Sequence, residues 1–248
     1  MSTLILALAA GAVIGLALGA LGGGGSVLAV PAMIYLLGFT PVAATTASLV
    51  IVAVTSVTAM CAHARDGNVR WRTGLLFAAA GIGPAMLGGA LAGRVPPAVL
   101  TAAFSVVAAV AALRMLRSRP PADTPAPVRP GRAAAAGAGL GAVTGVLGVG
   151  GGFLAVPALV SVLGLRMRNA VGTSLLVITV NSLAALTMRA GTADGLDWAV
   201  LGPFAGAAIL GAWDGKRLAA KVSGHTLQWI FGLVLLAVAA VMLIDAAM

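Results

Sequence analysis

Charged and aromatic side chains are scarce in this chain. Charged residues make up 8% of it and aromatic residues 4%, with six acidic residues and two histidines. Few groups are therefore available for acid–base catalysis. The chain also lacks a His-Glu-x-x-His, Gly-x-Ser-x-Gly or Gly-Lys-Ser/Thr element, which argues against an enzyme. A single cysteine, Cys61, excludes an intramolecular disulfide and a cysteine metal cluster, and no cofactor is expected.

Apolar residues dominate instead. They account for 60% of the chain, and the mean hydropathy is +1.09. Several stretches reach the roughly 20 residues needed to cross a bilayer without an acidic or basic residue. They are residues 2–62, 73–93, 95–113 and 226–244. Backbone groups in lipid must be paired within such a segment, so we predict an all-α polytopic protein of a bacterial-type inner membrane.

The positive charge of the chain fits membrane insertion. The formal net charge is +9, but the basic residues stand singly or in pairs at the ends of apolar runs. Lipid headgroups are the expected partners there, and nucleic acid is not. No basic residue precedes the first apolar run, so we expect a retained first helix and no cleaved signal peptide.

An internal duplication organises the chain. A shift of 126 positions superimposes Gly15, Gly19, Leu21, Gly22, Gly24 and Gly25 on Gly141, Gly145, Leu147, Gly148, Gly150 and Gly151. The same shift superimposes residues 28–32 on 154–158, both Leu-Ala-Val-Pro-Ala, and a small gap then aligns Trp71 with Trp198. We therefore predict membrane repeats at 1–116 and 133–248, joined by an extended linker at 117–132 rich in Pro, Ala and Arg.

The duplicated motif resembles that of a known family. It is a glycine-rich run followed by an apolar stretch and proline, at residues 19–31 and 145–157, together with Gly172-Thr173-Ser174-Leu175. In these residues both halves resemble the TauE/SafE family of sulfite and organosulfonate exporters, which implies a membrane transporter for a small sulfur-containing anion. The first half has Thr46-Ala47-Ser48-Leu49 where the second has Gly172-Thr173-Ser174-Leu175, so this element departs from the motif in one copy.

The glycine-rich segments are predicted to break the helices. Residues 3–37 are too many for one crossing, and four consecutive glycines at 22–25 disfavour a helix that can resume near Ser26. If each segment returns to the side it entered, the linker shares one side with Arg65, Arg70, Arg72, Arg166, Arg168, Lys216, Arg217 and Lys221. The positive-inside rule makes that side cytoplasmic. We thus predict two inverted repeats, each a Gly-broken helical hairpin plus three transmembrane helices.

Inverted halves with matching helix breaks indicate alternating access, with the site near the membrane midplane. A helix that restarts after a bend presents free N–H groups and its positive dipole end to an anion. The predicted binding positions are Gly22, Gly23, Gly24, Gly25 and Ser26 in one half and Gly148, Gly150, Gly151, Gly152 and Phe153 in the other. Glycines spaced four apart, at 11, 15 and 19 and at 137, 141 and 145, better fit close helix packing.

Polar side chains follow both bends. Thr45, Thr46, Ser48, Thr173, Ser174 and Asn181 are predicted to donate to the anion. For the hydroxyls, bonding to their own helix backbone is the alternative, and Asn181 is the strongest candidate because a mid-span amide has more polar atoms to satisfy. His63 and His225 lie near span ends, where contact with solvent or headgroups is expected, and Asp214 is expected to form a charge cluster with Lys216 and Arg217.

The sequence therefore predicts a secondary transporter that exports a small anion, most simply sulfite or an organosulfonate such as sulfoacetate. An anion channel, or an uptake permease for a sulfur-containing or carboxylate anion, is the alternative, because direction and gating leave no motif. The expected partners are the anion and membrane lipid, and a homodimer is left open.

Overall fold

The structure, a computed structural model, describes residues 2–23, 29, 32–39, 41–92, 97–117, 129–147, 152–188 and 198–247. All regular structure in these ranges is helical, which confirms the all-α prediction. The elements are α1 (Ser2–Leu21), η1 (Ala32–Leu36), α3 (Pro41–Arg65), α4 (Trp71–Ala92), α5 (Pro97–Arg117), α6 (Pro130–Leu147), α7 (Gly152–Ser161), α8 (Met167–Met188), α9 (Trp198–Lys221) and α10 (Gly224–Ala247).

Several of these helices have the length and surface of membrane spans. Four stretches within the described helices are long and apolar enough to cross a bilayer: Leu4–Leu21, Thr46–Arg65, Met167–Thr187 and Gly224–Ile244. Large apolar side chains such as Leu87, Leu210 and Val241 also point outward and are more than half exposed. An exposed apolar surface of this extent is expected of a protein surrounded by lipid.

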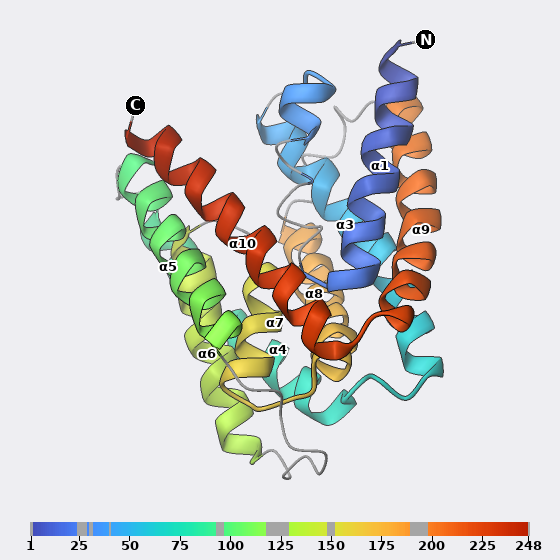
Figure 1. Cartoon of the computed structure of the whole chain (residues 1–248). Coiled ribbons are helices and arrows are strands. Elements are labelled where there is room, and N and C mark those ends of the chain that lie inside the picture. The colour runs from blue at the N-terminus through green and yellow to red at the C-terminus, as the bar shows by residue number, and fades with distance from the viewer. Residues whose placement is uncertain are drawn as a thin grey trace.

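The two halves of the duplication interlock. Helix α1 packs along α9, and its counterpart α6 packs along α4, so the first helix of each half lies against the fourth helix of the other (Figure 1). Helix α3 packs on α8, and α5 packs on α10. Each major pair therefore joins a helix of one half to a helix of the other, and the halves form one packed unit.

Spaced glycines make the two longest of these contacts possible. A Cβ added at Gly11, Gly15 or Gly19 of α1 would overlap the backbone of Phe204, Ala208 or Ala212 on α9. In the other half, a Cβ at Gly137 or Gly141 of α6 would overlap the backbone of Phe77 or Gly81 on α4. The prediction that these spaced glycines serve close helix packing is confirmed.

A matching turn closes the hairpin of each half. Gly38 and Gly164, 126 positions apart, both have positive φ, +70° and +67°. In each turn the next residue donates its N–H to a carbonyl six positions earlier, Phe39 to Met33 and Leu165 to Leu159, both at 3.0 Å. A glycine in the left-handed region commonly ends a helix, and the bond here reaches one residue further back than that of the Schellman motif. The duplication thus extends to backbone conformation.

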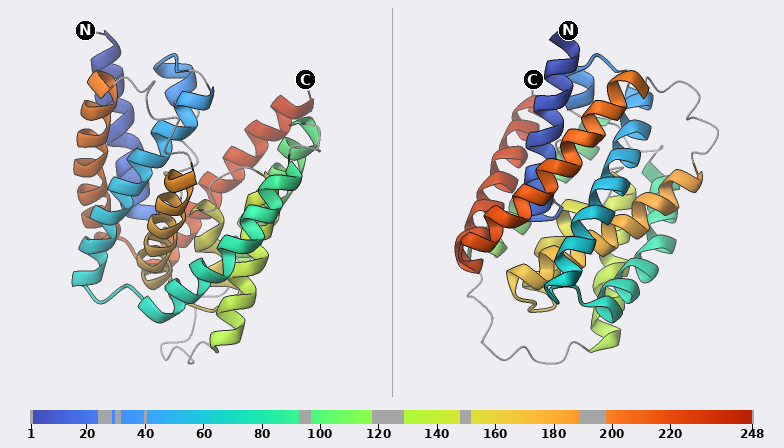
Figure 2. Two further views of the ribbon diagram at one scale, coloured as in Figure 1. Left: turned by 180° about the vertical axis from the view of Figure 1, so that it is seen from behind. Right: turned by 90° about the vertical axis from the view of Figure 1, so that its right-hand side faces the viewer.

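Corresponding helices of the two halves run in opposite directions. In Figure 1 α1 and α3 run downward from the top of the view, whereas α6 and α8 run upward. Helix α9 likewise runs against its counterpart α4, and α10 against α5, in Figure 1 and in both views of Figure 2. The chain therefore returns, after each first helix, to the end where that helix began.

The structure refines two sequence expectations. Helix α5 ends at Arg117 and α6 begins at Pro130, so residues 117 and 130–132 of the expected linker are helical. After the first glycine-rich segment, residues 32–36 form the π-helix η1, whereas residues 158–161 of the corresponding stretch belong to the α-helix α7. The expected restart near Ser26 lies outside the described residues.

Candidate functional site

The two glycine-rich segments meet inside the molecule. Gly23, just after α1, lies directly against the backbone of Gly152 and Phe153 at the start of α7, where an added Cβ would overlap the Gly152 carbonyl. Gly22 faces the second half as well, since a Cβ there would lie 2.5 Å from Ser174 Oγ and 3.3 Å from a Val156 methyl. Four of the predicted positions from two distant parts of the sequence, with Ser174, thus form one cluster.

Glycine is required at this junction for two reasons. Gly22 has φ +72°, a conformation that other residues adopt at a cost of about 1 kcal/mol or more. Its N–H donates to the Leu18 carbonyl at 2.8 Å and so ends α1. Gly23 then brings its backbone against that of Gly152, which a side chain would prevent. The contact between the two segments is therefore buried and lined by backbone atoms. It lies next to the N-terminus of α7, which is the positive end of the helix dipole.

Helix α8 adds polar groups to one face of this cluster. Ser174 and Asn181 are seven residues apart and so share a helical face about 10 Å in length. Ser174 Oγ lies beside Gly22 and donates to the Val171 carbonyl at 2.8 Å. The Asn181 side-chain oxygen is buried and has no hydrogen-bond partner among the described residues. It is an unused polar group on the face that continues from the junction.

Other hydroxyls of α3 and α8 hold the helices together. Ser56 and Thr179 hydroxyls lie 3.0 Å apart where α3 crosses α8. Each also bonds its own helix, Ser56 to the Ala53 carbonyl and Thr179 to the Leu175 carbonyl. Their bonding capacity is used within the protein, which fits a structural role.

The remaining predicted positions lie in α3 and α8 or outside the described residues. Thr173 is fully buried, and its hydroxyl accepts the Arg70 N–H at 3.1 Å, so it holds the segment that leads into α4. Thr46 and Ser48 are buried in α3. Of the other predictions, Gly24, Gly25, Ser26, Gly148, Gly150, Gly151 and the side chain of Thr45 lie outside the described residues.

A charged contact closes one end of the molecule beneath the junction. Lys216 of α9 donates to the Ala62 carbonyl at 2.7 Å and pairs with Asp66 at 2.8 Å, which ties α9 to the end of α3. The expected cluster of Asp214, Lys216 and Arg217 was wrong in this respect. Asp214 pairs with Arg217 at 3.6 Å, both well exposed, while Lys216 turns inward.

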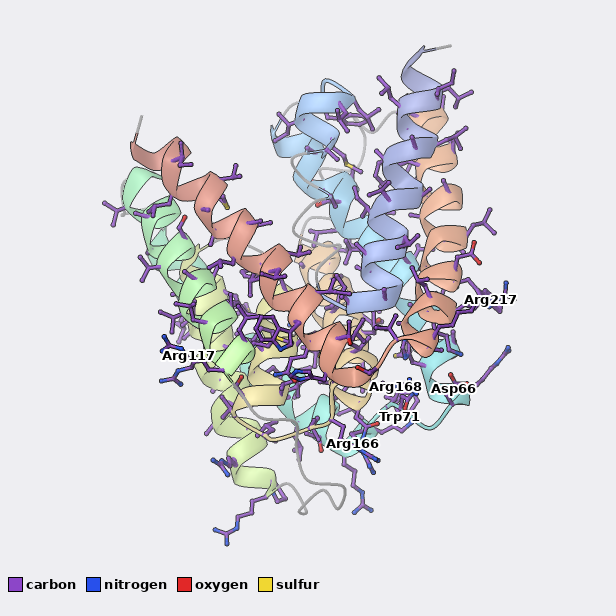
Figure 3. All side chains as sticks on the ribbon, viewed as in Figure 1. Asp66, Trp71, Arg117, Arg166, Arg168 and Arg217 are labelled. Carbon is purple, nitrogen blue, oxygen red and sulfur yellow. The ribbon has the colours of Figure 1, made fainter. Side chains whose placement is uncertain are left out.

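The same end is tied a second time. Arg168, at the start of α8, donates to the carbonyls of Ala220 and Val222 at the end of α9, at 3.1 and 3.2 Å. Figure 3 shows Asp66, Arg166 and Arg168 toward the lower end of the view. Charged side chains from both halves therefore lie at one end of the bundle.

His63 is the residue that sequence reasoning missed. The expected contact with solvent or headgroups was wrong, because only 5% of His63 is exposed. Its Nε2 lies 3.1 Å from the Gly19 carbonyl, one turn before the glycine-rich segment. The available signal was spacing: Val52, Ser56, Ala59 and His63 share one buried face of α3.

This geometry can be compared with known proteins. The model of a family described as sulfite exporter TauE/SafE matches residues 7–242, nearly the whole chain. The chain belongs to this family. TauE/SafE proteins are membrane transporters, so the chain is a multi-pass membrane transporter and not an enzyme. No group of three or more metal-binding side chains gathers in the part of the chain that the structure describes.

Two curated relatives support the assignment. Both are named "Probable membrane transporter protein", one from Xylella fastidiosa strain 9a5c and one from strain Temecula1 / ATCC 700964. Each is 36% identical over 245 residues, which is 96% of this chain and 94% of the relative. No solved structure matches the chain. The TauE/SafE similarity thus covers both glycine-rich segments and every described helix.

Proposed function

We propose that this TauE/SafE protein exports a small anion, sulfite or an organosulfonate such as sulfoacetate, by alternating access. The observation that carries the proposal is the contact between Gly23 and the Gly152–Phe153 backbone. This contact brings the helix breaks of the two repeats together inside the protein. In transporters built from inverted repeats, broken helices at the repeat interface form the substrate site.

The opposite directions of corresponding helices support an inverted-repeat mechanism. The four long helices of one half have counterparts that run the other way, and the two interlocked pairs, α1 with α9 and α6 with α4, have corresponding glycine contacts. In an inverted pair, a conformation of one half that opens the site to one side of the membrane has an equivalent in the other half that opens it to the opposite side. The site between them then faces each side in turn.

The chemistry of the junction favours an anion. Backbone N–H groups near the start of α7 and the positive end of its dipole attract negative charge without a basic side chain. The amide NH2 of Asn181, on the neighbouring face of α8, is a side-chain donor that suits the oxygens of a sulfonate or sulfite, whereas the hydroxyl proton of Ser174 is donated to the Val171 carbonyl. An inside-negative potential favours anion exit by about 2.3 kcal/mol per charge per 100 mV, so export requires no partner ion on energetic grounds.

We further propose that the end bearing Asp66, Arg166 and Arg168 faces the cytoplasm of the inner membrane, together with the linker between the halves. Basic residues concentrate there in both repeats, as the positive-inside rule requires. The contacts of Lys216 and Arg168 join the ends of α3, α8 and α9 there. Whether two copies associate as a homodimer is tested directly by the mass of the purified protein.

A thermal-shift screen of sulfite, sulfoacetate, other sulfonates and carboxylates tests the substrate class, because a ligand of the folded state raises the melting temperature. Flux in proteoliposomes at controlled potential then separates export from uptake and from channel conduction. If no anion raised the melting temperature in this screen, the proposal of an anion transporter would be wrong.

The decisive variant is Gly22→Ala, with Gly38→Ala as its matched control. Both glycines have positive φ, +72° and +70°, so both variants carry a similar backbone strain of about 1 kcal/mol. Only at Gly22 does the added methyl meet Ser174, whereas Gly38 has open space around it. We expect Gly22→Ala to lose at least about tenfold in anion flux and Gly38→Ala to keep it. Equal flux in both variants would remove the junction from the mechanism.

A further inference from the structure

His63 carries an unused buried nitrogen close to the junction. A carbonyl oxygen only accepts, so the Nε2 that lies 3.1 Å from the Gly19 carbonyl must be the donor. In a neutral imidazole the other nitrogen, Nδ1, is then an acceptor with a lone pair. This atom is buried and has no partner among the described residues. A buried polar atom without a partner costs stability, which calls for an explanation in function.

The surroundings of His63 define what the free nitrogen can bind. The charged groups that act on the imidazole are Lys216, on α9, and Asp66, just after α3. Helix α1 has no ionisable side chain, and α8 presents Gly172, whose added Cβ would lie 3.3 Å from the His63 Cβ. A metal ion would need a cavity, whereas a proton needs none, and Asp66 opposes the repulsion from Lys216. A proton is therefore the ligand that fits this nitrogen.

The position of His63 links it to the anion site. Its partner Gly19 lies one helical turn before Gly23, so the imidazole and the junction are separated by only about 5 Å of helix rise plus one hydrogen bond. Protonation at Nδ1 keeps the Nε2–H bond to Gly19 and adds one positive charge. In an interior with weak screening, that charge attracts an anion at the junction.

We propose that His63 is a proton-binding site coupled to anion binding at the junction of Gly22 and Gly23. This inference rests on the proposed anion site. A proton from water adds to Nδ1, no bond to carbon is made or broken, and the gained positive charge balances one negative charge of the anion. By linkage, the anion promotes protonation as much as the proton promotes anion binding.

Binding of sulfoacetate tests the coupling, because its sulfonate and carboxylate stay ionised at about pH 6 and about pH 8. The variant is His63→Gln, whose amide can still donate to the Gly19 carbonyl but cannot take up a proton. The matched control is His225→Gln, since His225 is exposed at the start of α10 and lies edge-on to Trp229.

We expect the wild type and His225→Gln to bind sulfoacetate roughly tenfold more tightly at pH 6 than at pH 8, and to take up protons on binding in weak buffer. His63→Gln should bind equally at both pH values without proton uptake. A full pH dependence in His63→Gln would overturn the coupling, as would pH-independent binding in the wild type. No binding by the wild type at either pH would overturn the anion site itself.

A second measurement covers poor folding of His63→Gln. In His225→Gln the only imidazole left is that of His63, so its ring proton resonance can be followed by NMR as a function of pH. We expect the protonated form to persist to higher pH when sulfoacetate is present. Coincident titrations with and without sulfoacetate would overturn the proposal.

Discussion

Asn181 is a polar residue whose side chain is only partly used by the fold. A buried amide oxygen without a partner costs about 1–3 kcal/mol, so its removal should not weaken the protein without ligand. We expect Asn181→Ala to leave the melting temperature of the ligand-free protein unchanged or slightly raised. We also expect it to weaken anion protection about tenfold in the thermal-shift screen.

Thr179→Val is the matched control for Asn181→Ala on the same helix. Thr179 bonds the Leu175 carbonyl at 2.8 Å and the Ser56 hydroxyl at 3.0 Å. Its loss should lower stability by about 1 kcal/mol and leave anion protection intact. A destabilised Asn181→Ala variant with normal anion protection would return Asn181 to a packing role.

Residue roles were predictable where spacing alone decides them. Glycines four apart lie on one face of a helix, which is why the packing role of Gly11, Gly15 and Gly19 could be inferred from the sequence. For His63, spacing places the side chain on the same face of α3 as Ser56 and Ala59, but its contacts depend on α1 and α9, which cover the end of α3. No local pattern near residue 63 states which helices will do so.

At the scale of elements, the end of α3 depends on a side chain from another helix. The last carbonyls of a helix have no partner within it. Lys216 of α9 donates to one of them, on Ala62, and also pairs with Asp66, whose side chain is about half exposed (48%). A cation near a helix C-terminus is favourable, and solvent screening limits the ion pair, so the whole contact is worth about 1–2 kcal/mol.

We therefore expect Lys216→Met to lower the melting temperature by about 2–8 °C, as measured by differential scanning fluorimetry. Arg217→Met is the control. Arg217 and Asp214 are both about 70% exposed and 3.6 Å apart, and such a surface pair contributes little. A similar loss in both variants would mean that general surface charge, and not the cap on α3, stabilises this end.

The duplicated sequence predicted which elements correspond but not how each is wound. The shift of 126 positions aligns the ends of α1 and α6 and the turns at Gly38 and Gly164, as the structure shows. Residues 32–36 form the π-helix η1, whereas residues 158–161 of the corresponding stretch belong to the α-helix α7. The two sequences, Ala-Met-Ile-Tyr-Leu at 32–36 and Ala-Leu-Val-Ser-Val at 158–162, share only their first residue, so the duplicated motif does not extend through this stretch.

At the scale of the whole molecule, the interlocking of the halves could not be read from the chain. The glycine stripe of α1 predicts a close helix partner without naming it. In the structure that partner is α9, from the other half, and α6 has the reciprocal relation with α4. Because the first helix of each half packs on the other half, neither half can bury its first helix alone. Two separately expressed halves should therefore associate or fail to fold.

Sidedness is the property of the whole molecule on which the mechanism depends most. Helix α9 has 24 residues and so spans about 36 Å, enough to place Trp198 and Lys221 on opposite sides of a bilayer core. In a Cys61→Ser background we expect Lys221→Cys and Arg129→Cys to react with an impermeant thiol reagent from the cytoplasmic side. Trp198→Cys should react from the other side, which provides an internal control on the same helix. All three sites are exposed.

The contradicting outcome is reaction of Arg129→Cys from the same side as Trp198→Cys. The linker would then lie opposite the basic end of α9, and the halves would not be inverted. Alternating access between them would have no structural basis.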